Sequence, residues 1–181
     1  MTQLILIISV VFLLSLFFGI YKSLSALSKM SEQYWSNVQS QLFRKYDLIT
    51  VLTDFIKNHS ELDKDAADKL MEAKLKAMQS YSPFQKSLTE KPLDDCIGYI
   101  LEITESDEKL KDDEKFLKIK DDISAVQQEL LMSSSYYNAI IRDYNSKITS
   151  FPSSLVARTL GHYNKETFDL DINLQTLNKT R

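Results

Sequence analysis

The stretch FLKIKDDISAVQQELLMSSSYYNAIIRDYNSKITSF, residues 116–151, carries apolar side chains at alternating steps of three and four residues. Side chains with that spacing share one face of an α-helix, so the stretch predicts one long helix with a single apolar stripe. The seven-residue repeat favours lengthwise packing against other helices at a shallow angle, as in bundles and coiled coils. The expected stripe consists of Phe116, Ile119, Ile123, Val126, Leu130, Ser133, Tyr137, Ile140, Tyr144, Ile148 and Phe151.

This helix needs partners, because ordering roughly 35 residues at about 1 to 2 kcal/mol each opposes the free energy gained by burying its stripe. The chain has only three glycines and three prolines, which disfavours a turn-rich β protein. We therefore predict an all-α fold in which about four long helices form an antiparallel bundle. The first partner helix is expected from its apolar positions Trp35, Val38, Leu42, Ile49, Leu52 and Ile56.

Two further helices are predicted between these segments. The sequence SELD at 60–63 has the form of a capping box, so a second helix is expected from there to about Ser80, with Leu70, Ala73, Ala77 and Tyr81 on one face. Residues 81–91 are interpreted as the main connection. Pro92 is then expected at the first position of a third helix, with Asp94 and Asp95 in its first turn.

The end of the long helix is predicted from Phe151 and Pro152, since proline disfavours helical backbone before it. Ser153 or Ser154 is expected to cap a short helix reaching about Leu160, which Gly161 would terminate. Residues 171–181 are expected to form a loose tail.

The N-terminal segment LILIISVVFLLSLFFGIY, residues 4–21, is the most apolar part of the chain, and no charged residue precedes Lys22. As a helix its residues rise by about 27 Å, close to the thickness of a bilayer hydrocarbon core. We therefore predict a transmembrane signal-anchor over residues 1–22 and a helical bundle over 23–170. Because no glycine or proline separates Lys22 from Ser60, the anchor is expected to continue into the first bundle helix as one rod ending near Asn58.

The orientation of the anchor is predicted from its flanks. Positive residues follow the apolar run and none precedes it, and the positive side normally stays in the cytoplasm. The N-terminus is expected outside and the bundle inside. The alternative is a cleaved signal peptide with a weak cleavage pattern at 23–26, which would make the bundle envelope-facing or secreted.

The residues typical of catalysis or metal binding do not form a recognisable set. Cys96 is the single cysteine, and His59 and His162 have no second histidine or cysteine at ligand spacing. No glycine-rich phosphate loop or nucleophile elbow is present, so we expect no cofactor, no metal and no enzymatic activity. Acidic and basic residues, 25 and 22, are mixed along the chain, which disfavours a nucleic-acid partner.

One polar group on the long helix is a candidate contact site. Asn138, Arg142 and Asn145 are spaced by four and three residues and so lie on one helix face, beside Tyr137 and Tyr144. They could recognise a partner. We favour a structural role at the bundle seam, in which an amide and the guanidinium hydrogen-bond neighbouring helices and fix their register.

The block WSNVQSQLFRKYDLI at 35–49 resembles the first-helix signature of the LemA family, roughly W-x-x-I-x-x-Q-L-x-R-R-x-D-L-I. The resemblance extends over about residues 33–169. The chain departs from the family pattern at Thr50-Val51, at Ser135-Tyr136, near 107–108, and at Lys74 and His162. The match also extends through Glu72-Ala73-Lys74, in which Lys74 stands where the family tends to have arginine. Further matching positions are Leu110-Lys111, Phe116, Tyr137-Asn138, Tyr144-Asn145, Phe151-Pro152, Ala157, Gly161 and Phe168.

The resemblance implies an anchored antiparallel helical bundle in a bacterial membrane, and it assigns no reaction. The expected function is therefore that of a single-pass protein of the bacterial inner membrane whose cytoplasmic bundle is a scaffold or adaptor for another protein. An unrecognised enzyme built around Asn138, Arg142 and Asn145 is a further alternative. Self-association is also open, because a second copy can cover an apolar stripe.

Overall fold

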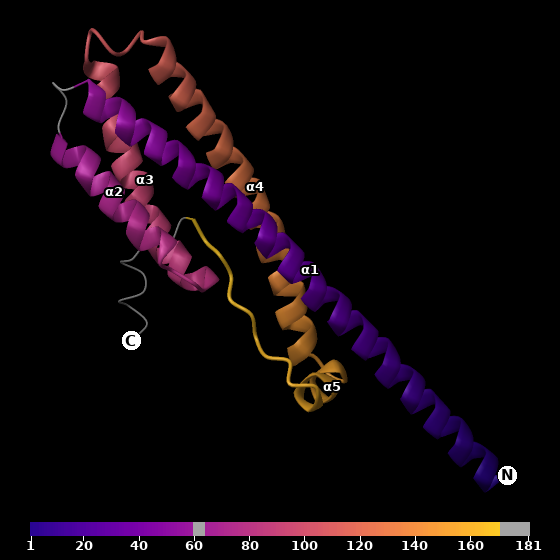
Figure 1. The fold of residues 1–181 in the computed structure, drawn as a ribbon. Coiled ribbons are helices and arrows are strands. Elements are labelled where there is room, and N and C mark those ends of the chain that lie inside the picture. Colours follow the sequence, from indigo (N-terminus) through magenta and orange to yellow (C-terminus); the bar gives the residue numbers. More distant parts are fainter. Residues whose placement is uncertain (60–63, 171–181) are drawn as a thin grey trace.

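The structure is a computed structural model that describes residues 1–59 and 64–170 (Figure 1). Over these residues it is all-helical and contains no strand, which confirms the predicted fold class. The helices are α1 (Thr2–Asn58), α2 (Lys64–Met78), α3 (Pro83–Ser106), α4 (Glu114–Thr149) and α5 (Ser153–Thr159).

The four longer helices alternate in direction and form a bundle (Figure 1). α4 packs lengthwise against α1, α3 packs against α2, and α2 also contacts α1. The short α5 folds back onto α4 and α1. The core of the bundle lies between α1, α2, α3 and α4, and its fully buried members include Val38, Leu42, Ile49, Leu52, Leu70, Leu93, Ile100, Phe116 and Ile141.

α1 is one unbroken helix that ends at Asn58, as predicted. Its 57 residues extend over about 85 Å at roughly 1.5 Å per residue, and its N-terminal part projects beyond the rest of the molecule (Figure 1). The large apolar side chains from Leu4 to Phe18 are 41–66% exposed. Within the described chain, α1 is the one helix long and apolar enough to cross a membrane.

The buried stripe of α4 differs from the predicted one in its second half. Ser134 and Ile141 are buried in place of Ser133 and Ile140, and Phe151 lies beyond the helix and is 82% exposed. A straight helix has 3.6 residues per turn, so a strict seven-residue repeat drifts by about 20° per heptad. After two heptads the seam must shift by one residue to keep facing α1.

The predicted start of the third helix is wrong. α3 begins at Pro83, where the Ser82 side chain accepts a hydrogen bond from the Gln85 amide and the Gln85 side chain accepts one from the Ser82 amide. This capping box and the proline at the first position nucleate the helix nine residues upstream of the expected start. Pro92 therefore lies inside α3, on its exposed side.

Smaller differences concern the helix ends. α2 ends at Met78, so Tyr81 lies in the turn before α3 and is 87% exposed instead of sharing the face of Leu70. The N-cap of α5 is Pro152, without a side-chain cap from either serine. Gly161 follows α5 with φ +71°, which favours glycine. The predicted capping box at 60–63 and the tail at 171–181 lie outside the described residues.

Candidate functional site

The C-terminal strap, residues 162–170, is an extended segment that runs from α5 back along the bundle towards α3 (Figure 1). It has no regular secondary structure, so its backbone amides and carbonyls need partners from elsewhere. Side chains of α4 and α3 supply several of them. The strap therefore depends on specific side chains for its place in the fold.

Asn138 and Asn145 each hold one strap residue by both backbone groups. The Asn138 Nδ2 donates to the Phe168 carbonyl at 2.6 Å, and its Oδ1 accepts from the Phe168 amide at 2.9 Å. The Asn145 side chain makes the same pair of bonds to Lys165, both at 2.9 Å. Arg142 does not join them: it is exposed and forms no hydrogen bond or ion pair within the described part of the chain.

Aromatic side chains cover the strap between the two asparagines. Phe168 is fully buried, and its ring lies 5.7 Å from that of Trp35, which in turn lies 5.2 Å from that of Tyr137. The Tyr137 hydroxyl donates to the Glu166 carbonyl at 2.7 Å, and burial raises the pKa of Tyr137 to about 12. The strap thus connects α1 and α4 through a shared apolar contact.

The two ends of the strap contact different helices. Near its start, the Lys165 Nζ donates to the Ser31 hydroxyl of α1 at 2.6 Å and lies 5.1 Å from the centre of the Tyr144 ring. The Tyr144 hydroxyl lies 2.9 Å from His162 Nδ1. At its end, the Asp169 amide donates to the Ser87 hydroxyl of α3 at 2.8 Å. The strap therefore ties α1, α3 and α4 together.

A second polar arrangement, the buried ionic cluster, lies between α1 and α3. It comprises Lys45, Tyr46, Lys86, Glu90 and Asp94. The Lys45 Nζ lies 2.7 Å from Glu90 Oε2 and 2.6 Å from Asp94 Oδ1, and the Tyr46 hydroxyl donates to the other Glu90 oxygen. Lys45 and Glu90 are 1% and 0% exposed, so both charges are removed from water and depend on each other.

The electrostatics of this cluster follow from burial and from the carboxylates. Burial opposes the charge on Lys45, but Glu90 and Asp94 outweigh it and raise the pKa of the Lys45 ammonium above its ordinary value. Burial and the Glu90 charge raise the pKa of Tyr46 well above its ordinary value. Burial lowers the pKa of Lys86, whose Nζ donates to the Ala77 carbonyl at 3.1 Å.

Sequence reasoning missed the ionic cluster, although one signal was present. Lys45 lies three residues after Leu42 and four before Ile49, in the middle of an apolar stripe where a charge needs a buried partner. That partner, Glu90, fell in the segment taken for a connection because the third helix was expected to start at Pro92. The error in the helix boundary concealed the site.

An apolar groove of about 530 Å³ lies between α1 and α4, at the end of the bundle away from the N-terminus. Val51 contributes a 50% exposed side chain to it, and charged Lys115, Lys118 and Asp122 border it. His59 lines the same groove, with its Nδ1 2.8 Å from the Phe55 carbonyl. Apolar and charged side chains therefore both line this groove.

The polar groups of both arrangements are paired with one another or with the backbone. Every buried side-chain nitrogen and oxygen among the described residues has a hydrogen-bond partner within the protein. Over residues 1–59 and 64–170 no group of three or more His, Cys, Asp or Glu side chains could hold a metal ion. Cys96 is free and partly buried against the core. The arrangements can fix strap and helix register, which is a structural role.

The model of the LemA family matches residues 34–179. The chain belongs to the LemA family. Comparison with curated proteins found no match. The matched region contains the whole strap and the whole ionic cluster, whereas the exposed apolar run of α1 precedes it.

Several of the residues that match the LemA pattern lie close together at the strap. Trp35, Tyr137, Asn138 and Phe168 contact one another there, and Asn145 holds its beginning. The family pattern thus selects the residues that attach the C-terminal segment to α1 and α4.

Two departures from the LemA pattern are also linked in space. The Lys74 Nζ of α2 donates to the Thr50 hydroxyl of α1, so the two unusual residues are hydrogen-bonded partners. A third departure, His162, contacts Tyr144. All three residues therefore lie at internal contacts of the bundle.

Proposed function

We propose that this LemA-family protein is a single-pass protein of the bacterial inner membrane whose helical bundle is a non-enzymatic scaffold or adaptor in the cytoplasm. One observation carries the proposal. α1 exposes a contiguous apolar surface over its first 18 residues and then buries its apolar side in the bundle without a break. Soluble monomers rarely expose apolar patches of that extent, and lipid is the environment that such a surface suits.

The continuity of α1 supports an adaptor role, because an unbroken helix couples the bundle directly to the span. The groove at the far end of α1 and α4 would then be held at a set distance from the bilayer. We propose that another protein binds there. A nucleic-acid partner does not fit, since the chain has a formal net charge of −3.

Topology in living cells tests the location. A reporter that is active on only one side of the membrane is fused after Arg181, and a blot follows an N-terminal tag. A cytoplasmic signal from a full-length, membrane-bound chain is the expected result, in keeping with Lys22 and Lys29 on that side. An external signal would place the bundle in the envelope, and loss of the tag would show a secreted form.

Crosslinking tests the adaptor role. A photocrosslinking residue at Val51 is expected to capture a different protein. The same residue at Met132, which is 59% exposed against 50% for Val51 and does not line the groove, is not. Capture of a second copy would identify a homo-oligomer instead. Equal labelling at both positions would contradict the groove as a docking site. Substrate turnover that a point substitution abolishes would overturn the non-enzymatic role.

A further inference from the structure

The α4–α5 corner carries an unusual amount of exposed apolar surface. We define it by Phe151, Leu155, Leu160 and Tyr163, whose side chains are 82%, 61%, 39% and 80% exposed. The opposite side of α5 is already used, because Val156 and Ala157 are buried against α1 and α4. The corner is therefore apolar on the side that packs and also on the side that faces away from the bundle.

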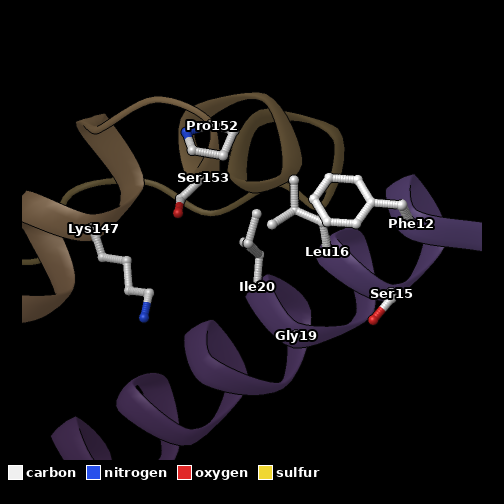
Figure 2. A pocket seen from close by; sticks show the side chains of 8 residues that line it. All are labelled: Phe12, Ser15, Leu16, Gly19, Ile20, Lys147, Pro152 and Ser153. Carbon is white, nitrogen blue, oxygen red and sulfur yellow. The ribbon is translucent and has the colours of Figure 1, made fainter. Parts of the chain in front are cut away.

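The α4–α5 corner packs against the N-terminal part of α1. Val156 and Ala157 share an apolar cluster with Ile20 and Leu24 of α1. Figure 2 shows Phe12, Leu16 and Ile20 facing the turn at Pro152 and Ser153, across a groove of about 460 Å³. Phe12, Leu16 and Ile20 all belong to the run that we propose to span the membrane. The corner consequently lies beside that run and not beyond it.

The depth of the corner follows from helix geometry. From Phe12 to Lys22, α1 rises by about 15 Å at roughly 1.5 Å per residue, which is half of a hydrocarbon core about 30 Å thick. An element that contacts α1 between Phe12 and Ile20 lies within the leaflet on the side of the bundle. Large apolar or aromatic side chains suit that depth, and Phe151, Leu155, Leu160 and Tyr163 are of this kind, whereas the exposed Arg158 of α5 needs a polar environment.

The charges around the corner agree with this placement. Residues 1–31 and 144–165, which the fold brings together, contain no acidic residue, so all 25 acidic residues of the chain lie elsewhere. The Lys147 Nζ donates to the Ser23 hydroxyl, one residue past Lys22, and Arg158 is exposed on α5. Basic side chains at this level suit lipid phosphates. The basic residues of the two segments are Lys22, Lys29, Lys147, Arg158 and Lys165.

We propose that the α4–α5 corner is a second membrane contact, in which Phe151 and Leu155 insert into the leaflet that α1 crosses and lipid acyl chains fill the groove beside Leu16. The corner then anchors the bundle at two points, α1 and α5. Two contacts restrict rotation and tilting of the bundle about the membrane normal, which a lone span permits. This inference rests on the proposed spanning of α1, but not on which side of the membrane the bundle faces.

Depth-dependent fluorescence quenching tests the contact in the full-length protein. The protein, with Cys96→Ser, is reconstituted in vesicles of phosphatidylcholine and phosphatidylglycerol, about three parts to one, with or without brominated acyl chains. An environment-sensitive fluorophore is attached through Leu155→Cys, or in a second variant through Phe151→Cys. Both side chains are largely exposed, so labelling leaves the core intact. Leu16→Cys reports the span, and Leu131→Cys, which is 57% exposed on the middle of α4, is the control outside the membrane.

Brominated lipid is expected to quench the fluorophore at 155 and at 151 to a degree similar to that at 16, and several-fold more than at 131. Quenching at 16 without quenching at 155 and 151 would overturn the second contact and leave the anchor standing. Absence of quenching at 16 as well would contradict the proposed anchor itself. Equal quenching at 131 and 155 would also overturn the proposal, because the bundle as a whole would then lie on the bilayer.

Discussion

Replacing Glu90 by glutamine removes one charge from the buried ionic cluster and keeps the shape of the side chain. Glu90 is fully buried, and its two oxygens accept from Lys45 and Tyr46. The amide of glutamine has one acceptor oxygen, so in Glu90→Gln one of these donors loses its partner. Lys45 keeps its charge, and of its two carboxylate partners only Asp94, at 2.6 Å, remains.

The expected loss of stability can be bounded from these contacts. Removing one member of a buried ion pair costs about 3 to 5 kcal/mol. Asp94 retains part of the Coulomb energy of Lys45, and the glutamine oxygen keeps one hydrogen bond of about 1 kcal/mol. We therefore expect Glu90→Gln to lower the free energy of unfolding by about 2 to 4 kcal/mol, a large part of the roughly 5 to 15 kcal/mol of a typical domain.

Urea unfolding of the full-length protein in mild detergent measures this loss. Trp35, the single tryptophan, packs against Tyr137 and Phe168 inside the bundle and reports the transition. The matched control is Glu129→Gln, which breaks an ion pair of the same length, 2.7 Å, between exposed partners. Such a pair contributes less than about 1 kcal/mol.

A double variant separates the ion pair from a mere loss of packing. Lys45→Met combined with Glu90→Leu removes both charges, and we expect it to recover most of the stability that Glu90→Gln loses. The reasoning is refuted if Glu90→Gln costs no more than Glu129→Gln. It is also refuted if the double variant, combined with Tyr46→Phe to remove the hydroxyl that Glu90→Leu leaves without an acceptor, is less stable than Glu90→Gln, because an unpaired charge would then not explain the loss.

Three further predictions concern the strap and its pH dependence. Asn138→Ala together with Asn145→Ala should accelerate tryptic cleavage at Lys165 at least tenfold. Each asparagine makes a pair of hydrogen bonds to the strap backbone worth about 1 to 3 kcal/mol, and about 1.4 kcal/mol corresponds to a tenfold change in the population of the open strap. Arg142→Ala, which removes the exposed side chain between them, should leave the cleavage rate unchanged. Phe168→Ala should lower the free energy of unfolding by about 3 to 5 kcal/mol in the same urea experiment, and a loss below about 1 kcal/mol would contradict its burial. The pKa of Tyr137 in the folded protein, about 12, exceeds the ordinary value of 10.0. Its contribution to the free energy of unfolding is therefore complete below pH 10 and is lost as the pH rises towards 12. Between about pH 9 and 12 the free energy of unfolding should fall less steeply for Tyr137→Phe than for the unaltered protein, and an unchanged slope would contradict this assignment.

The sequence alone was sufficient for the fold class and for the longest helices. Apolar spacing predicted α4 and the bundle half of α1, and the lack of glycine and proline predicted the unbroken helix up to Asn58. These features are local, because they follow from helical periodicity and from the backbone preferences of single residues. Asn138 and Asn145 were selected for the same reason, since their spacing places them on one helix face.

The tertiary structure decided what those local features contact. Local signals competed at the start of α3, where the capping box at Ser82 prevailed over Pro92. The shift of the α4 stripe to Ser134 and Ile141 follows from the lengthwise packing of α4 against α1. Asn138 and Asn145 hold the strap instead of a neighbouring helix, and Arg142 on the same face holds nothing among the described residues.

The sequence-based prediction and the structure differ most in the pairing of charges and of apolar side chains that are far apart in the sequence. Lys45 and Glu90 are 45 residues apart, and Ile20 and Val156 are farther still, so no periodicity within one helix could pair them. The sequence determined which segments become helices and which of them suits a membrane, because those properties arise within a few turns of chain. Only the packing of α1, α3, α4 and α5 decided which charges are buried together and which apolar corner lies beside the N-terminal apolar run, because both depend on contacts between distant segments.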